Sequence, residues 1–337
     1  MRFLDRIEQH TFAPILDGLD AARRWLLDRG GRVTRPFIRD RDRRVLAFAL
    51  IAFTFAFAGT ALAPGYMLLL GPIIVGVPHL FFEARYLFFQ HAQLRKLALV
   101  GVLVAQTALV FAGVGIYTLG LATIAALIAT GSLSTRKATS ISALSALAIA
   151  GALVGPDWSR FLLLHLHNCV PLAVWLLWRK RPLATSLGVA ALFAIGVTLI
   201  FAGALDGMSL RRPFNDEVFS LTRIADATAA GFGGEWRQRF LLFFCFTQAA
   251  HYAMWLRLIP EEARERPTPR SWRQSWQTFK REAGPSVARL MIIGSIAVPV
   301  VAVAVGIVRT RALYVTASEF HATVEAILIA VVFVRRR

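Results

Sequence analysis

Long apolar blocks separated by short polar connections dominate this chain of 337 residues. A helix needs roughly 20 residues to cross about 30 Å of hydrocarbon, and most of the blocks approach or exceed that length. The pattern therefore predicts an all-α, polytopic transmembrane helix bundle with about ten spans. The fourth and fifth blocks are short enough to form a thin or re-entrant hairpin instead. The predicted spans are 45–63, 66–90, 97–117, 119–133, 141–155, 160–178, 184–206, 238–258, 286–309 and 313–334.

Basic residues between the blocks predict the orientation. Clusters at 41–44, 95–96, 136–137, 179–181 and 335–337 fall on one side of the predicted membrane, whereas most connections on the other side are short and weakly charged. Because basic loops stay in the cytoplasm, we expect both ends of the chain there, in a bacterial-type inner membrane. The expected parts are a basic amphipathic segment 1–44, a helical domain 45–334 and a basic tail 335–337.

Three segments outside the spans have predicted structures of their own. Apolar residues recur along the N-terminal segment as one stripe of an interfacial helix, which Gly30 and Gly31 are expected to end. The outer loop 207–237 contains a stretch, 216–230, with the pattern of a short helix lying across the outer face. The loop 259–285 is expected to be cytoplasmic.

Composition narrows the function classes. Apolar residues make up 56% of the chain and charged residues 17%, so lipid is the main solvent. The net charge of +18 would suggest nucleic acid in a soluble protein, but these charges lie between the spans, where they contact lipid head groups. We therefore expect a lipid-bilayer partner and no nucleic acid. The two cysteines indicate neither a disulfide framework nor a thiolate site.

Five of the seven histidines fall inside predicted spans: His79, His165, His167, His251 and His321. A lone membrane histidine usually makes one hydrogen bond between helices. Five of them, all on spans that run in the same direction, favour a shared metal site. All five are candidate metal ligands.

Two glutamates follow histidines at helical spacing. Glu83 lies four residues after His79, and Glu325 four after His321, so each pair shares a helix face. A carboxylate in hydrocarbon costs roughly 2.5–3.5 kcal/mol on insertion scales, a cost that a divalent metal or an ion pair with Arg85 would offset. Glu83 and Glu325 are therefore the candidate catalytic residues.

Two further polar groups are candidates for binding a cofactor. His165 and His167 point about 200° apart on a regular helix, so we expect one to bind metal and the other to hydrogen-bond, with Asn168 as an orienting partner. Gln248 and His251 share a face, with Tyr252 and Trp255 close by. Asn168, Gln248 and Tyr252 complete the predicted site; polar contacts between helices and an aromatic belt are the alternative interpretation.

The run Gly76-Val77-Pro78-His79 lies in a predicted span that Gly71-Pro72 also interrupts, and further intramembrane histidines follow it. This arrangement resembles the Brp/Blh family of membrane β-carotene dioxygenases. The resemblance covers about a dozen residues. It implies a histidine-ligated iron that cleaves a polyene, with His79 as a ligand and His165 or His167, His251 and His321 as candidates for the rest. This chain has more predicted spans than that family would suggest. The histidine boxes of membrane desaturases are absent from the sequence.

The leading hypothesis is a membrane-embedded Fe(II) oxygenase, of dioxygenase type, that acts on a hydrophobic small molecule such as a carotenoid, quinone or lipid. Zn is the alternative metal. Two other functions stay open: an electron-transfer protein that binds haem b or quinone, and a proton-coupled transporter. The sequence does not indicate an oligomeric state.

Overall fold

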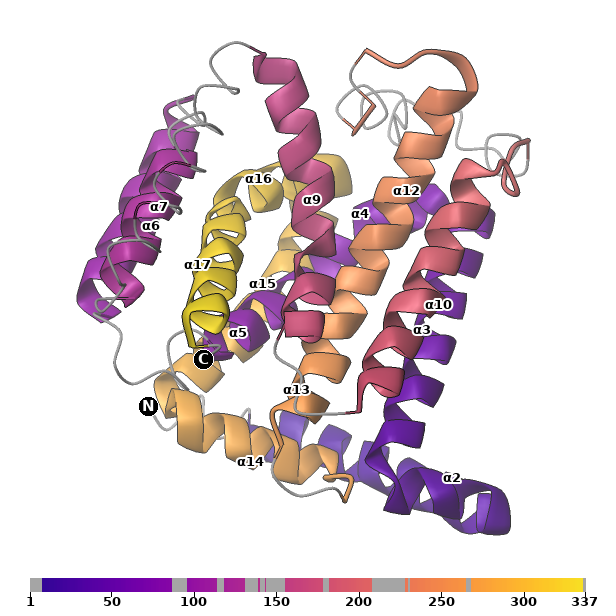
Figure 1. The fold of residues 1–337 in the computed structure, drawn as a ribbon. Coiled ribbons are helices and arrows are strands. Elements are labelled where there is room, and N and C mark those ends of the chain that lie inside the picture. The colour runs from indigo at the N-terminus through magenta and orange to yellow at the C-terminus, as the bar shows by residue number, and fades with distance from the viewer. Residues whose placement is uncertain are drawn as a thin grey trace.

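The computed structural model describes residues 8–86, 96–113, 118–130, 155–177, 182–207, 231–264 and 268–335, with the single positions 139, 143, 228 and 229. Every regular element in the described residues is a helix, which confirms the all-α prediction. Figure 1 shows steep helices side by side, closed at the lower end by helices that run across them. The elements are η1 (Glu8–Phe12), α2 (Ala13–Arg39), α3 (Arg41–Leu62), α4 (Pro64–Ile74), α5 (Gly76–Ala84), α6 (Lys96–Phe111), α7 (Thr118–Thr130), α9 (Pro156–Leu177), α10 (Leu183–Phe201), α12 (Gly234–Ala253), η5 (Met254–Leu258), α13 (Ile259–Glu262), α14 (Trp272–Ala283), α15 (Pro285–Val305), α16 (Ile307–Ser318) and α17 (Phe320–Arg335).

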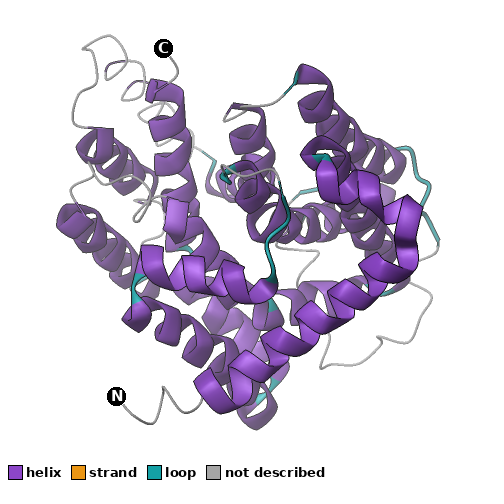
Figure 2. Cartoon of the chain, turned by 90° about the horizontal axis from the view of Figure 1, so that it is seen from below, coloured by secondary structure: helices purple, strands orange, loops and turns teal. Residues whose placement is uncertain are grey.

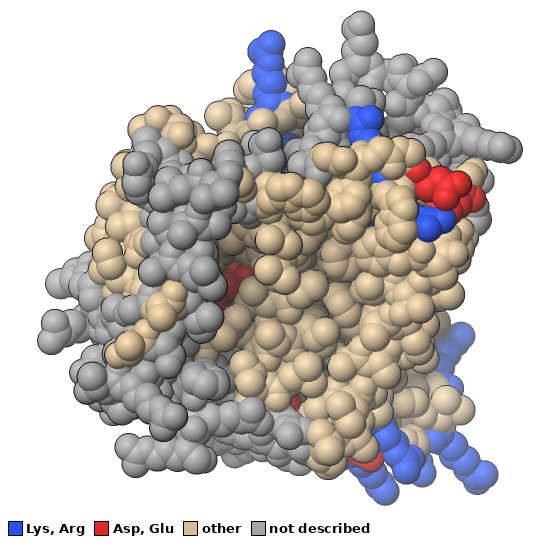
Figure 3. Space-filling view, turned by 45° about the horizontal axis from the view of Figure 1, so that its top comes forward, with Lys and Arg blue, Asp and Glu red and all other residues tan. Residues whose placement is uncertain are grey.

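Among the described helices, three are long and apolar enough to cross a membrane: α3, α10 and α15. A fourth crossing results if α4 and α5, which are bent by 53°, form one broken span. Shorter apolar helices lie within α6, α9 and α17. Figure 3 shows a broad face without basic residues between two ends where Lys and Arg gather. The described part of the chain thus has the composition of a membrane protein, with fewer clear crossings than the ten predicted.

Two regions differ from the expected boundaries. The turn predicted at 310–312 lies inside α16, because the chain already turns at Gly306, whose φ of 102° suits glycine. The span predicted at 313–334 is consequently divided at Glu319 into α16 and α17. The predicted span 141–155 and the outer helix 216–230 lie almost wholly outside the described residues.

The main core lies between α3, α9, α10 and α12. Phe53, Phe193 and Phe246 meet there, with ring centroids 5.6–6.4 Å apart. Gly196 permits this contact, since a Cβ at that position would lie 2.4 Å from the Phe246 ring. Lipid is as apolar as this core, so close packing stabilises the helix contacts more than the hydrophobic effect does. The core fixes α9 and α12 relative to each other.

Two prolines interrupt the helix pair α4–α5: Pro78 has no N–H for the carbonyl of Ile74, where α4 ends, and Pro72 lies within α4. Pro72 has no N–H to donate to the carbonyl of Leu68, one turn earlier. Arg311 on α16 replaces the missing donor, with its Nε 2.8 Å from the Leu68 oxygen. A regular helix resumes after Val75, where the His79 N–H donates to the Val75 carbonyl at 3.1 Å. The break sets the direction in which α5 presents His79.

Helices α2 and α14 cross the lower end of the bundle, which Figure 2 shows from below. Ser271 and Gln274 form a capping box that begins α14. Asp20 of α2 accepts hydrogen bonds from the backbone N–H groups of Trp272 (2.8 Å) and Arg273 (3.2 Å), which attaches the two helices to each other. The expected end of the N-terminal helix at Gly30 and Gly31 is present as a break, because Gly31 has non-helical angles (φ 47°, ψ −114°) and a second helical segment of α2 follows it to Arg39.

Candidate metal centre

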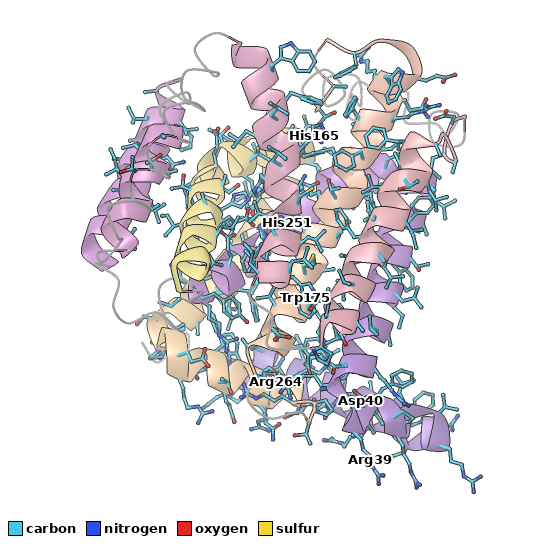
Figure 4. The ribbon with its side chains drawn as sticks, in the orientation of Figure 1. Arg39, Asp40, His165, Trp175, His251 and Arg264 are labelled. Carbon is cyan, nitrogen blue, oxygen red and sulfur yellow. The ribbon has the colours of Figure 1, made fainter. Side chains whose placement is uncertain are left out.

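Four histidines from four helices meet inside the bundle. The ring centroid of His79 (α5) lies 5.3 Å from that of His251 (α12) and 5.4 Å from that of His321 (α17). The ring of His167 (α9) lies 4.8 Å from His251 and 4.4 Å from His321. Figure 4 places His251 midway along the bundle. We call these four residues the imidazole cluster; it unites four of the five predicted histidine ligands.

The hydrogen bonds of two cluster members define their protonation. His321 Nδ1 bonds to the Ser318 carbonyl, which only accepts, so this nitrogen carries the hydrogen. His167 Nδ1 lies 2.7 Å from Glu325 Oε2 and donates to that carboxylate. Both Nε2 atoms therefore present lone pairs, and they face each other at 2.9 Å. Two lone pairs at this distance would repel, and either a proton shared between the two nitrogens or a bound metal ion would remove this repulsion.

A metal ion fits these donors. Nitrogen ligands that bind a metal at about 2.0–2.1 Å and at right angles to each other are about 2.9 Å apart. The ligand atoms of His79, His251 and His321 all lie within 4.8 Å of one another, and so do those of His167, His251 and Glu325. The two groups share His251 and so belong to one site. Neutral imidazole is a ligand that iron and zinc both accept.

Glu325 lies at the centre of the hydrogen bonds around the cluster. It is fully buried, and its Oε1 accepts a hydrogen bond of 2.7 Å from Trp255 Nε1. The same oxygen lies 3.5 Å from His251 Nε2, while Oε2 accepts from His167. Both oxygens of Glu325 are thus engaged. The carboxylate holds the neighbouring imidazole rings in position, as carboxylates commonly do when they accept a hydrogen bond from a metal-ligating histidine.

Glu83 lies one helical turn from His79 and is also buried. Among the described residues, the carboxylate oxygens of Glu83 have no hydrogen-bond partner, and neither do the ring nitrogens of His79 at normal geometry. The Val75 and Gly76 carbonyls lie near His79. The expected alternative, an ion pair with Arg85, is wrong because Arg85 Nε pairs with Glu282 at 2.5 Å. Glu83 thus offers an unengaged carboxylate beside the cluster.

His165 does not join the cluster, which corrects its place among the metal ligands. Its Nε2 bonds to the Thr228 carbonyl at 2.6 Å, and its ring stacks on Phe243 at 5.1 Å. Figure 4 shows it nearer the upper end of the bundle than His251. The regular turn of α9 directs His165 and His167 to opposite sides. The expected bond from Asn168 to His165 is not formed, since Asn168 Nδ2 and His165 Nδ1 are both unpaired in the described residues.

Tyr252 and Gln248, the other predicted polar groups, lie against the cluster. The Tyr252 ring centroid is 4.6 Å from that of His79 and 5.7 Å from that of His251. Gln248 is a hydrogen-bond partner of the Tyr252 hydroxyl. These two residues therefore extend the polar region from the imidazoles toward α16.

Sequence reasoning missed three residues of this region: Ser318, Arg311 and Tyr314. Ser318 acts through its backbone carbonyl, which no side-chain pattern reveals. Arg311 and Tyr314 were assigned to an outer turn and to a span, and only the fold of α16 brings them against α4 and α5. An arginine between two apolar blocks was the one available signal.

Comparison with known proteins gives no match: no family model, no curated protein and no solved structure is significantly similar to this chain. The resemblance to the Brp/Blh family therefore stays a prediction. The function has to be argued from the geometry of the site.

Proposed function

We propose that this protein is a membrane-embedded, iron-dependent oxygenase that acts on an apolar substrate dissolved in the bilayer. The observation that supports this function best is the pair of facing lone pairs on His167 and His321, 2.9 Å apart, within a cluster of four imidazoles. Iron and zinc both accept imidazole ligands, but of the two only iron activates dioxygen. Fe(II) is therefore the metal proposed, with Zn as the alternative.

The proposed orientation keeps the topology derived from the sequence, with about ten spans and both ends in the cytoplasm of a bacterial-type inner membrane. The helices across the lower end carry many basic residues, among them Arg29, Arg39 and Arg273. A basic end is typical of the cytoplasmic side. This end also holds the start of α3, where Asp40 caps the helix by accepting from the Asp42 and Arg43 N–H groups.

The residues of the site have separate proposed roles. His79, His167, His251 and His321 would hold the metal, which, when bound, supplies activation of dioxygen. Glu325 and Trp255 fix the His167 ring so that its Nε2 faces inward. Glu83, with no partner of its own, is placed to hold or accept a proton close to the reacting atoms. Burial of His79, His251 and the two glutamates helps to exclude water from the reaction.

An apolar substrate suits the outer face of the bundle. Figure 3 shows that the apolar face is hollowed beside the grey atoms, with an acidic side chain visible at the floor of the hollow. A molecule dissolved in lipid can approach such a hollow without passing through water. This supports a hydrophobic substrate, of which carotenoids, quinones and lipids are examples.

The geometry disfavours haem. Two imidazoles that bind one haem iron from opposite sides hold their nitrogens about 4 Å apart, at twice the usual bond length. The His167 and His321 nitrogens are closer than this, and the rings of His251 and His79 lie only 4.8 Å from the His167 ring and 5.4 Å from the His321 ring, respectively. A proton shared between His167 and His321, as in a proton-coupled transporter, remains the competing explanation that experiment must reject.

Metal analysis of the purified protein tests the proposal. We expect about one iron per chain, and a large loss of iron in His79→Ala, His251→Ala and His321→Ala. His165→Ala is the matched control, because His165 lies in the membrane outside the cluster, and it should keep its iron. The metal-enzyme proposal would be rejected if the purified protein contained neither iron nor zinc and His79→Ala changed neither stability nor activity. A proton shared between His167 and His321 would then be the remaining explanation.

A further inference from the structure

Four hydrogen-bonding side chains lie together beside the imidazole cluster. We define the donor subsite as Arg311 and Tyr314 of α16 with Tyr252 and Gln248 of α12. Arg311 interacts electrostatically with Tyr252, and Tyr252 interacts in the same way with Tyr314. Because the Tyr252 ring is 4.6 Å from that of His79, the subsite is continuous with the cluster.

Glycines in the broken span make room for this subsite. A Cβ at Gly76 would lie 2.4 Å from the Tyr314 hydroxyl oxygen, and a Cβ at Gly71 would lie 3.4 Å from the Tyr252 ring. The Tyr314 hydroxyl thus lies directly against the backbone of α5, whereas the Tyr252 ring makes only an ordinary contact beside Gly71 of α4. Gly76 is three residues before His79, so α16 sets the position of the subsite relative to the proposed metal.

Arg311 is half-buried and, unlike Arg44 and Arg85, has no anionic partner in the described part of the chain. Arg44 pairs with Glu261 and Arg85 with Glu282, each at 2.5 Å. In the described part of the chain, no carboxylate lies within 4.0 Å of the Arg311 guanidinium, whose one hydrogen bond runs from Nε to Leu68. A guanidinium has five N–H donors, and only one of those of Arg311 is hydrogen-bonded within the described residues. The remaining donors are therefore available to an anionic ligand.

We propose that the donor subsite binds the carboxylate of a long-chain carboxylic acid, whose apolar chain then lies along the imidazole cluster. This inference rests on the proposed function and names its substrate class. A carboxylate matches the planar fork of Arg311, and the Tyr314 and Tyr252 hydroxyls and the Gln248 amide can donate to its oxygens. A hydroxyl or ketone end group would leave the arginine charge uncompensated.

Equilibrium binding of oleate, oleyl alcohol and 1-octadecene to the full-length protein in phosphatidylcholine nanodiscs tests the proposal. Oleate should bind at least ten-fold more tightly than the other two. Arg311→Gln should weaken oleate binding about ten- to hundred-fold, as expected for a lost charged hydrogen bond, and should leave oleyl alcohol unaffected. Arg309→Gln, an exposed position on the same helix, is the matched control and should bind oleate normally.

Glutamine at position 311 keeps an N–H donor for the Leu68 carbonyl, so folding should persist. Tyr314→Phe, which removes one hydroxyl and retains the ring, provides a second variant and should weaken oleate binding by a smaller factor. Equal binding of oleate and oleyl alcohol, or normal oleate binding by Arg311→Gln, would overturn the proposal. Equally effective competition by dioleoyl phosphatidylglycerol would also overturn it, by indicating a general lipid head-group site. Iron measured on the same samples reports separately on the proposed function.

Discussion

At the scale of single residues, the centre depends on which atoms of each imidazole are already engaged. The Nδ1 atoms of His167 and His321 bond to Glu325 and Ser318, so their Nε2 atoms are left for a metal. Glu325 also accepts from Trp255 and therefore cannot turn away from His167 easily. This carboxylate is expected to affect metal affinity mainly by orienting the His167 ring.

Glu325→Gln should lower metal affinity about 10- to 100-fold, the usual effect of removing a carboxylate that orients a ligating histidine. Glutamine keeps the shape but can no longer accept from both His167 and Trp255 as an anion. Trp255→Phe removes only one donor to this carboxylate and should cost less. Competition for iron with a chelator measures both effects. If the two variants bind iron as tightly as the parent protein, the orienting role is wrong.

How far the sequence predicts the site depends on the kind of residue. Helical spacing alone puts Glu83 beside His79 and Glu325 beside His321, and the opposite directions of His165 and His167 follow from the helix period. The sequence could not show which of those two histidines faces inward, because that depends on how α9 rotates against α12 and α17. Ser318 and Arg311 contribute through tertiary contacts, which no local pattern encodes.

At the scale of elements, the broken span of α4 and α5 organises the site. Pro72 frees the Leu68 carbonyl for Arg311, and the 53° bend directs α5 and His79 toward the cluster. The sequence indicated the break through its Gly-Pro pairs. It did not indicate α16, because the chain turns at Gly306, before the turn expected at 310–312. A glycine at which φ is positive carries no distinctive sequence signal on its own.

Gly76→Ala should destabilise the protein, because its Cβ would overlap the Tyr314 hydroxyl at 2.4 Å. Overpacking of this kind typically costs about 1–3 kcal/mol. Gly101→Ala on α6 is the matched control, since a Cβ there has nothing within 4 Å, and it should be neutral or slightly stabilising. The apparent unfolding midpoint in detergent measures both changes.

Tyr314→Ala in the Gly76→Ala background should recover part of the lost stability, because it removes the atoms that the new Cβ meets. Strictly additive effects of the two substitutions would show that Tyr314 does not pack on Gly76. The double variant should also bind oleate more weakly than the parent protein, since it lacks one hydroxyl of the donor subsite.

At the scale of the whole molecule, charge divides the protein into an apolar body and two ends where basic residues gather. The net charge of +18 resides mainly outside the apolar helices, and α2 and α14 carry part of it across the lower end. This division was predictable from the sequence, because lipid excludes unpaired charge from long helices. The ion pairs that attach the lower end to the spans were not predictable, since Arg44 and Glu261 are far apart in the chain.

Glu261 is the centre of these ion pairs. Its Oε1 pairs with Arg44 of α3 at 2.5 Å and its Oε2 with Arg264 at 2.6 Å; Figure 4 labels Arg264 at the lower end. Burial alone would raise the pKa of Glu261. The hydrogen bond from Arg44 and the charges of Arg264, Arg44 and Arg257 outweigh burial and hold this pKa below its ordinary value of 4.5. The ionised carboxylate therefore stabilises the folded protein.

Glu261→Gln should lower the free energy of unfolding by about 3 kcal/mol at pH 7, because it leaves buried arginines without their anion. Since the folded pKa is depressed, the contribution of Glu261 is complete above pH 4.5 and is lost as the pH falls through the lower, folded value. The unfolding midpoints of the parent and Glu261→Gln should thus differ at pH 7 and converge below pH 4.5.

Glu235→Gln, which removes a largely exposed partner of Arg239, is the control and should change stability by less than about 0.5 kcal/mol. A difference between parent and Glu261→Gln that persists unchanged at low pH would mean that packing, and not the charge of Glu261, joins α13 to α3.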